Sequence, residues 1–148
     1  MAVKTTAIVN ASVGKVWALV SDVGGLMRWY PMVRKCEATG SGRGATRKVA
    51  FDDWWATELL TEIDDEAHRL NYLITDSRRP IAIGASGRMT LSVTGEGSTR
   101  LEWMTRNAPD NPHGAELDAQ LAAYYPERVN HLRAALGLPA RDCVASLI

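Results

Sequence analysis

The hydrophobic period of this chain changes once, near residue 111, and this change limits the folds that the chain can adopt. Before it, short strand-like runs alternate with turn-type residues; the runs are residues 4–10, 33–39, 45–51, 54–63, 69–75, 81–94 and 100–106. Strands spaced so closely are joined by short connections, which predicts an antiparallel meander. After it, apolar side chains recur every three or four residues, which predicts one long amphipathic helix.

The predicted C-terminal helix carries one apolar stripe, made of Leu117, Leu121, Tyr125, Val129, Leu132 and Leu136. Pro126 lies inside the stripe, where it removes a backbone hydrogen bond and predicts a kink without ending the helix. Gly137 and Pro139 mark the end of the helix. The sequence therefore predicts a single domain over residues 1–138 and a tail over residues 139–148.

Two short helices are expected after the first strand. Ser12 is a candidate N-cap for a helix over residues 13–20, and a second helix is expected over residues 22–29. One long helix cannot fully cover a curved sheet, so a cavity is expected between helix and sheet, where ligands commonly bind. The predicted fold class is α+β: a curved antiparallel sheet of six to seven strands around a long C-terminal helix.

Composition and charge argue against several classes of protein. The 148 residues suffice for one core, and 17 basic residues balance 17 acidic ones without a basic tract, which argues against nucleic acid as a partner. No apolar run reaches the roughly 18 to 20 residues of a membrane span, and the start of the chain reads as a strand and not as a signal peptide. Cys36 and Cys143 fit a reduced chain, so a cytoplasmic location is expected.

Arg47 and Glu58 are equally distant from the midpoint of an Asp52-Asp53 pair. If that pair forms a two-residue hairpin turn, Arg47 faces Glu58 across two strands. The same register pairs further residues on that surface, namely Phe51 with Trp54 and Val49 with Ala56. Desolvating two ions costs several kcal/mol each, so a charged pair on an apolar surface needs a reason. It either holds the hairpin together or lines a pocket for chemistry or ligand recognition.

Metal, cofactor and nucleophile signals are weak in this sequence. His68, His113 and His131 have no Asp or Glu at convincing ligand spacing, so no metal site is predicted. His113 is a surface residue at a helix start or, alternatively, an acid or base at the cavity mouth. The glycines of residues 40–44 imitate a dinucleotide fingerprint, but a strand follows them, so a turn is predicted. No serine or cysteine has a nucleophile context, and no cofactor is predicted.

Several segments, taken in order over about 130 residues, match one known pattern. They are residues 8–11 with 16–22, Trp29 with Pro31, residues 44–47, 58–60 with 63–64, 70–72, 101–103 and 125–132. In this pattern the chain resembles the START-like (SRPBCC) helix-grip superfamily, specifically its polyketide cyclase/dehydrase branch, although Tyr30 stands where that family often has His. The resemblance implies a hydrophobic cavity for small organic molecules. The superfamily includes cyclases, dehydratases, lyases, hormone receptors and lipid carriers, so the resemblance does not indicate one activity.

Glu58, Arg47 and Tyr72 are the candidate catalytic residues. Glu58 would remove a proton next to a substrate carbonyl, Arg47 would stabilise the enolate oxygen, and Tyr72 would donate a hydrogen bond to a ligand carbonyl. The alternative is a structural ion pair beside a packed phenol. A set of aromatic and apolar residues is predicted to form the ligand-binding wall or, alternatively, plain core: Trp29, Tyr30, Phe51, Trp54, Met89, Leu91, Trp103, Leu121 and Tyr125.

Two functional hypotheses follow. The favoured one is a cofactor-free cyclase or dehydratase, or a related lyase or isomerase, that acts on a polyketide-like or aromatic molecule by acid–base chemistry. The alternative is a non-catalytic carrier or sensor of a lipid or hydrophobic metabolite. A closed Arg47–Glu58 pair would favour the carrier, and a side chain directed at open space beside Tyr72 would favour the enzyme. The basic loop at residues 78–80 is either a solvated loop or a contact for an acyl carrier protein.

Overall fold

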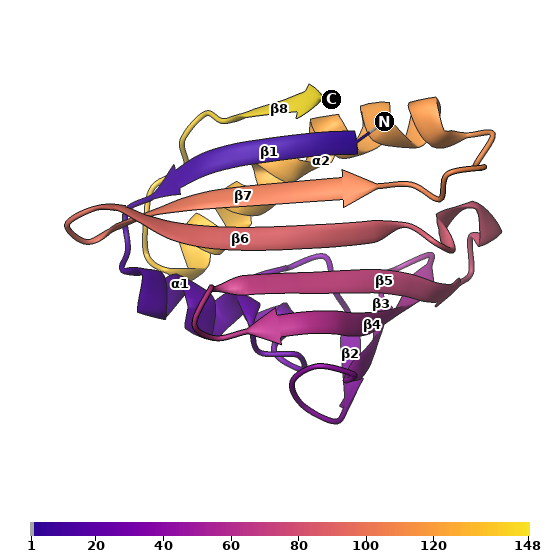
Figure 1. Ribbon diagram of the computed structural model, residues 1–148, viewed down its shortest axis with the longest axis horizontal. Coiled ribbons are helices and arrows are strands. Elements are labelled where there is room, and N and C mark those ends of the chain that lie inside the picture. The colour runs from indigo at the N-terminus through magenta and orange to yellow at the C-terminus, as the bar shows by residue number, and fades with distance from the viewer. Residues whose placement is uncertain (1) are drawn as a thin grey trace.

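A single antiparallel sheet dominates the computed structural model, which describes residues 2–148 (Figure 1). Its eight strands lie in the order β2-β3-β4-β5-β6-β7-β1-β8. In chain order the strands are β1 (Ala2–Val9), β2 (Lys35–Thr39), β3 (Thr46–Ala50), β4 (Trp55–Asp64), β5 (Arg69–Ser77), β6 (Ser86–Gly95), β7 (Ser98–Arg106) and β8 (Val144–Leu147). The predicted α+β meander is confirmed, with one strand more than the sequence indicated.

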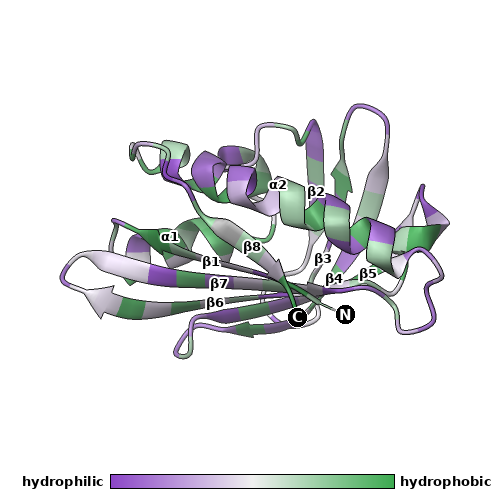
Figure 2. Ribbon diagram, turned by 90° about the horizontal axis from the view of Figure 1, so that it is seen from above, coloured by the Kyte–Doolittle hydropathy of each residue, from purple (hydrophilic) through white to green (hydrophobic). Residues whose placement is uncertain are grey.

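The long helix α2 (Gly114–Ala135) lies across one face of the sheet (Figure 2). Tyr125, Val129 and Leu132 of the predicted stripe are buried against the core. The helix runs through Pro126 without ending, because apolar contacts continue on both sides of the proline and offset the lost backbone bond. Among residues 2–148, no helix combines the length and apolarity that a membrane crossing requires.

The first short helix, α1 (Val13–Val20), has the predicted bounds. Ser12 is its N-cap, and the Ser12 side chain accepts a hydrogen bond from the backbone N–H of Lys15. The second predicted helix is wrong in length: only a 3-10 turn, η1 (Leu26–Arg28), forms there. A glycine pair precedes this turn, and glycine backbones lose the most conformational freedom in a helix, so a longer helix is not stable at this point.

The strand predicted to begin at residue 81 begins later. A 3-10 turn, η2 (Pro80–Ala82), occupies the first part of that run, and β6 starts only at Ser86. Pro80 sets the backbone angle that opens such a turn, and Gly84 adopts a positive φ of 89°, which a side-chain-bearing residue would rarely tolerate. The loop from β5 to β6 is therefore longer than the sequence pattern indicated.

The segment predicted as a tail contains β8, which pairs antiparallel with β1 from Val3↔Leu147 to Thr6↔Val144. Arg133 of α2 holds the connection in place, because its Nη2 donates to the Ile8 carbonyl at 2.8 Å and its Nη1 to the Arg141 carbonyl at 3.2 Å. A four-residue edge strand carries little signal of its own. Its pairing depends on a distant strand that the local pattern does not reveal.

Candidate functional site

The predicted register of the β3–β4 hairpin is confirmed. The backbone N–H of Phe51 donates to the Trp54 carbonyl at 2.8 Å, which closes a two-residue turn at residues 52–53. Arg47 consequently lies opposite Glu58. A β-bulge follows at once, because the pairing of β4 with β5 shifts register between Thr57 and Glu58. Bulges bend a strand and re-aim side chains, and they are common near functional sites.

Arg47 and Glu58 form a short, buried ion pair. The Arg47 Nε donates to Glu58 Oε1 at 2.8 Å, and the two side chains are only 6% and 15% exposed. Arg47 Nη1 also donates to the Val23 carbonyl at 3.5 Å. Burial opposes the charge of Arg47, but attraction to Glu58 and the hydrogen bond outweigh it and raise the pKa of Arg47. The guanidinium is thus charged and paired inside the molecule.

Two buried phenols lie next to this pair. Tyr72 accepts a hydrogen bond from Trp103 Nε1 at 3.1 Å. Burial, followed by the charge of Glu58, raises the pKa of Tyr72 to about 12, and burial raises the pKa of Tyr125 well above its usual value of 10.0. Both phenols therefore stay protonated near neutral pH. Such groups serve as hydrogen-bond donors to a ligand and not as bases.

Gly87 makes room for Tyr72. The two residues face each other across β5 and β6, and a Cβ placed on Gly87 would collide with the ring of Tyr72. A side chain here would displace the phenol from Trp103. The glycine therefore fixes where the Tyr72 hydroxyl lies.

Six of the predicted ligand-wall residues form a continuous series of ring contacts, called the aromatic chain here. It runs from Trp54 through Phe51, Tyr30, Trp29 and Trp103 to Tyr125. Its two ends are stacked pairs, Phe51 on Trp54 and Trp103 on Tyr125, each with ring centroids 4.3 Å apart. The aromatic chain crosses from the β3–β4 hairpin to α2, so these residues share one interior surface.

The three apolar members of the predicted wall also face this interior. Met89 and Leu91 of β6 are buried in the core, and Leu121 of α2 is half-buried and packs against it. The rings and apolar side chains pack on one another in this arrangement. The cavity predicted between the sheet and α2, and the ligand-binding role of these residues, therefore stay predictions.

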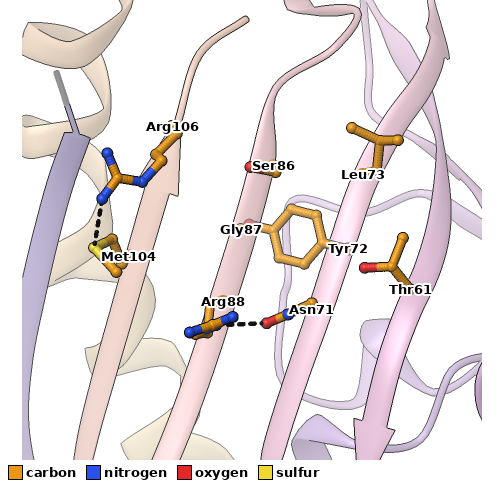
Figure 3. Close-up of a pocket in the computed structure, with 9 residues that line it drawn as sticks. All are labelled: Thr61, Asn71, Tyr72, Leu73, Ser86, Gly87, Arg88, Met104 and Arg106. Carbon is orange, nitrogen blue, oxygen red and sulfur yellow. Dashed lines mark hydrogen bonds between the residues drawn. The ribbon is translucent and has the colours of Figure 1, made fainter.

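A hollow of about 380 Å³ lies on the opposite face of the sheet (Figure 3). Its lining includes Asn71, Leu73, Arg88, Met104 and Arg106, which alternate along their strands with the buried residues that face α2. Two of the lining side chains, Arg88 and Asn71, hydrogen bond to each other at 3.0 Å. Tyr72 and Gly87 also line this outer hollow, whereas Arg47 and Glu58 do not. The hollow therefore reaches Tyr72 from the outer face of the sheet and is not the cavity predicted between the sheet and α2.

Arg128 of α2 is a residue of this interior that was not predicted from the sequence. The Arg128 guanidinium lies over the rings of Tyr30 and Tyr124, with its Cζ 4.5 and 5.3 Å from the ring centroids. Its Nε and Nη1 are buried without a hydrogen-bond partner among residues 2–148. Burial lowers the pKa of Arg128 to about 10. A signal was available: Arg128 follows Tyr124 and Tyr125 by four and three residues, a spacing that places all three on neighbouring parts of the helix.

The remaining candidates from the sequence lie at the surface or in the packing. His113 is 53% exposed and 3.9 Å from Glu116, and His68 packs its ring edge-on against Trp17. Within residues 2–148 there is no cluster of three or more His, Cys, Asp or Glu side chains that could hold a metal. The glycines of residues 40–44 form a turn with positive φ angles, as predicted.

The basic loop packs against the β3–β4 turn. Arg78 Nη1 donates to the Asp53 carbonyl at 2.7 Å, and Arg79 lies 5.5 Å from the Trp54 ring centroid. Two arginines thus lie beside the hairpin end of the aromatic chain. A contact with an acyl carrier protein at this loop stays a prediction.

Solved structures with the same fold include proteins of several kinds. An uncharacterized protein from Bacillus thuringiensis has a TM-score of 0.78 and 20% identity, covering 91% of this chain and 98% of its own. The di-domain ARO/CYC protein BexL of the BE-7585A biosynthetic pathway has a TM-score of 0.76 and 17% identity over 93% of this chain and 46% of its own. Norcoclaurine synthase from Thalictrum flavum has a TM-score of 0.72 and 16% identity over 92% and 86%. These likenesses show the helix-grip fold.

Sequence comparison gives the family. No curated protein matches this chain. The family described as "Polyketide cyclase / dehydrase and lipid transport" matches residues 1–137, which include every candidate site residue named above. Fold and family together indicate a ligand-binding domain of the SRPBCC type. The chain belongs to the polyketide cyclase/dehydrase and lipid transport family.

Proposed function

We propose that this protein binds an aromatic or polyketide-like molecule between the sheet and α2 and converts it by acid–base chemistry. The observation that supports this function is a polar group set into an aromatic interior: the Arg47–Glu58 pair beside the protonated Tyr72. Rings of the aromatic chain offer stacking surfaces for a planar ligand. The Tyr72 hydroxyl can donate a hydrogen bond to a carbonyl oxygen of such a ligand, and the Glu58 carboxylate can accept a proton from the carbon beside that carbonyl.

The roles of the three residues differ in one respect from the sequence hypothesis. Arg47 donates hydrogen bonds to Glu58 and to the Val23 carbonyl, so its proposed task is to orient the Glu58 carboxylate. Glu58 then removes a proton from the carbon next to a ligand carbonyl, and the Tyr72 hydroxyl donates to the enolate oxygen. The enolate carbon attacks a second carbonyl carbon of the same molecule, which closes a ring, and the alkoxide that forms takes the proton back from Glu58. Glu58 then removes the second proton from the attacking carbon, a carbon–carbon double bond forms, and the departing hydroxide takes that proton from Glu58 and leaves as water.

A carrier is the competing function, and a specific observation favours it. Arg47 and Glu58 satisfy each other at 2.8 Å and are nearly buried, as a purely structural pair would be. In that case the same interior would bind a hydrophobic molecule and release it unchanged. The polyketide-like ligand and the carrier's lipid share apolar chemistry, so binding alone does not separate the two functions.

A turnover assay distinguishes the enzyme from the carrier. We suggest an aryl diketone as the test substrate, because its intramolecular condensation forms a cyclohexenone. The absorbance of the cyclohexenone then measures the rate of turnover. Glu58→Gln should lower kcat/KM by about 100-fold or more, because it removes the base and keeps the shape of the side chain. Glu62→Gln is the matched control, since Glu62 lies on the same strand and pairs with Arg69 at 2.7 Å in a more exposed position.

The outcomes are distinct. A large loss in Glu58→Gln, with the unfolding midpoint and the activity of Glu62→Gln unchanged, supports the enzyme. Equal turnover by wild type and Glu58→Gln excludes Glu58 as the base. Retained ligand binding with no turnover by wild type supports the carrier.

A further inference from the structure

Arg128 is a half-buried cation whose guanidinium has two buried donors, Nε and Nη1, without an acceptor among residues 2–148. Burial lowers the pKa of Arg128 to about 10, and no carboxylate counteracts that effect. Arg47, by comparison, has the Glu58 carboxylate at 2.8 Å. Arg133, like Arg128, has no carboxylate partner among residues 2–148, but its guanidinium donates to the Ile8 and Arg141 carbonyls. Arg128 has only the faces of Tyr30 and Tyr124.

Two tyrosine faces do not compensate such a cation. A cation–π contact is a weak stabilising interaction when it is partly exposed. A buried donor left without an acceptor costs more free energy than such a contact supplies, above all when the donor is charged. The two ring faces leave the hydrogen-bond donors of the guanidinium unsatisfied, because those donors lie at its edges and need acceptor atoms. The unmet donors of Arg128 therefore lower the stability of the folded protein, and a bound acceptor would remove this penalty.

The position of Arg128 connects this cation to the proposed ligand site. Tyr30 is a link of the aromatic chain, 5.9 Å from Phe51 and 5.4 Å from Trp29 between ring centroids. Trp29 Nε1 is a further buried donor without a partner among residues 2–148. Tyr124, the other ring that Arg128 contacts, is 49% exposed. Arg128 therefore lies where the aromatic chain approaches the surface, and its unmet donors are of the kind that an anion satisfies.

We propose that Arg128 binds an oxyanion, a carboxylate or a phosphate, carried by the small-molecule ligand, while Tyr30 and Tyr124 hold the guanidinium by its faces. Hydrogen bonds from guanidinium to such groups are charge-assisted and stronger than neutral ones. This inference rests on the proposed aromatic-ligand site and adds the chemical class of one end of the ligand. The ligand is then amphiphilic: an aromatic or apolar body along the aromatic chain and an acidic group at Arg128.

The test uses three probes with the same naphthyl body: 2-naphthoate, its neutral amide 2-naphthamide, and 2-naphthyl phosphate. Quenching of tryptophan fluorescence gives their dissociation constants. Wild type should bind at least one anionic probe about tenfold or more tighter than the amide, because only an anion gains the charge-assisted contacts. The naphthoate and phosphate arms then identify which oxyanion fits.

Arg128→Met and Arg128→Gln should each remove this preference while leaving amide binding within about twofold. The glutamine variant keeps polar atoms without charge, so it covers the case in which methionine disturbs the packing. Arg79→Met is the matched control, because Arg79 also lies over a ring of the aromatic chain but on an exposed loop; it should keep the preference.

The outcomes separate the two proposals. Equal binding of anion and amide by wild type, or an unchanged preference in both Arg128 variants, overturns the role of Arg128 and leaves the aromatic site standing. Failure of all three probes to bind wild type overturns the aromatic site and the role of Arg128 together. A preference lost only in the Arg128 variants supports the inference.

Discussion

Two arginines in the interior of this protein meet opposite conditions. Arg47, on the β3–β4 hairpin, gives its Nε to the carboxylate of Glu58 and its Nη1 to the Val23 carbonyl. Arg128, on α2, lies over two tyrosine rings and has two buried donors without an acceptor among residues 2–148. The pKa of Arg47 is raised and that of Arg128 is lowered to about 10. The charged form of arginine is thus stabilised at position 47 and destabilised at position 128.

The difference contrasts a buried cation that has its counter-ion inside the protein with a cation that has none among residues 2–148. A buried cation that already has its anion contributes to a closed unit, and removing the anion is costly. A buried cation without an anion weakens the empty protein, so its retention favours a task outside folding. We therefore expect mutations of the Arg47–Glu58 pair and of Arg128 to change the free energy of unfolding in different ways.

The largest effect is expected from Arg47→Met. It leaves the Glu58 carboxylate buried without its cation, so the free energy of unfolding should fall by about 3 to 5 kcal/mol. Urea unfolding at neutral pH measures it. The double variant Arg47→Met/Glu58→Leu should regain most of the loss, because no buried charge remains. A loss below about 1 kcal/mol would place this pair among ordinary surface pairs and end the contrast with Arg128.

An intermediate effect is expected from Tyr72 at alkaline pH. Its pKa is raised from the ordinary 10.0 to about 12, first by burial and then by the Glu58 charge. The resulting stability is fully present below pH 10 and is lost as the pH rises toward 12. By linkage it amounts to about 3 kcal/mol. Tyr72→Phe should therefore show a smaller decline in unfolding free energy between these pH values than wild type.

Arg128 acts in the same pH window with the opposite sign. Its folded pKa, about 10, is below the ordinary 12.5, so its penalty is complete below pH 10 and is relieved as the pH rises. Unfolding curves of Tyr72→Phe and Arg128→Met, recorded over this range, should consequently deviate from wild type in opposite directions. Deviations of the same sign would show that the two sites do not differ as described.

The smallest effect is expected from Arg128→Met in the ligand-free protein at neutral pH. The variant loses two cation–π contacts but no longer buries unmet donors, so its unfolding free energy should stay equal or rise by about 1 kcal/mol. The thermal midpoint measures this change. A loss comparable to that of Arg47→Met would reveal a partner for Arg128 and contradict the comparison.

The sequence predicted the Arg47–Glu58 contact because its causes are local. A two-residue turn and strict alternation determine which residues face each other, and both are readable within a dozen positions. Ser12 and the apolar residues after it likewise determine α1. The stripe of α2 was readable from periodicity alone.

What the sequence could not predict depends on distant segments. Arg128 acquires its environment from Tyr30, nearly a hundred positions away in the chain, and no periodicity links them. The strand β8 exists only because β1 offers an edge. Pro80 and Gly84 shortened a predicted strand through backbone geometry that hydrophobic pattern does not report. Whether an interior admits a ligand depends on how rings pack, which composition does not specify.

The β1–β8 pair brings the two ends of the described chain together. Ala2 and Ile148 exchange two backbone hydrogen bonds of 2.9 Å each. Joining these residues by a short linker and reopening the backbone in the exposed turn at residues 40–44 would preserve every strand pair of the sheet. Circular permutation would thus move the new termini next to the β3–β4 hairpin, where a fused reporter would be close to the Arg47–Glu58 pair.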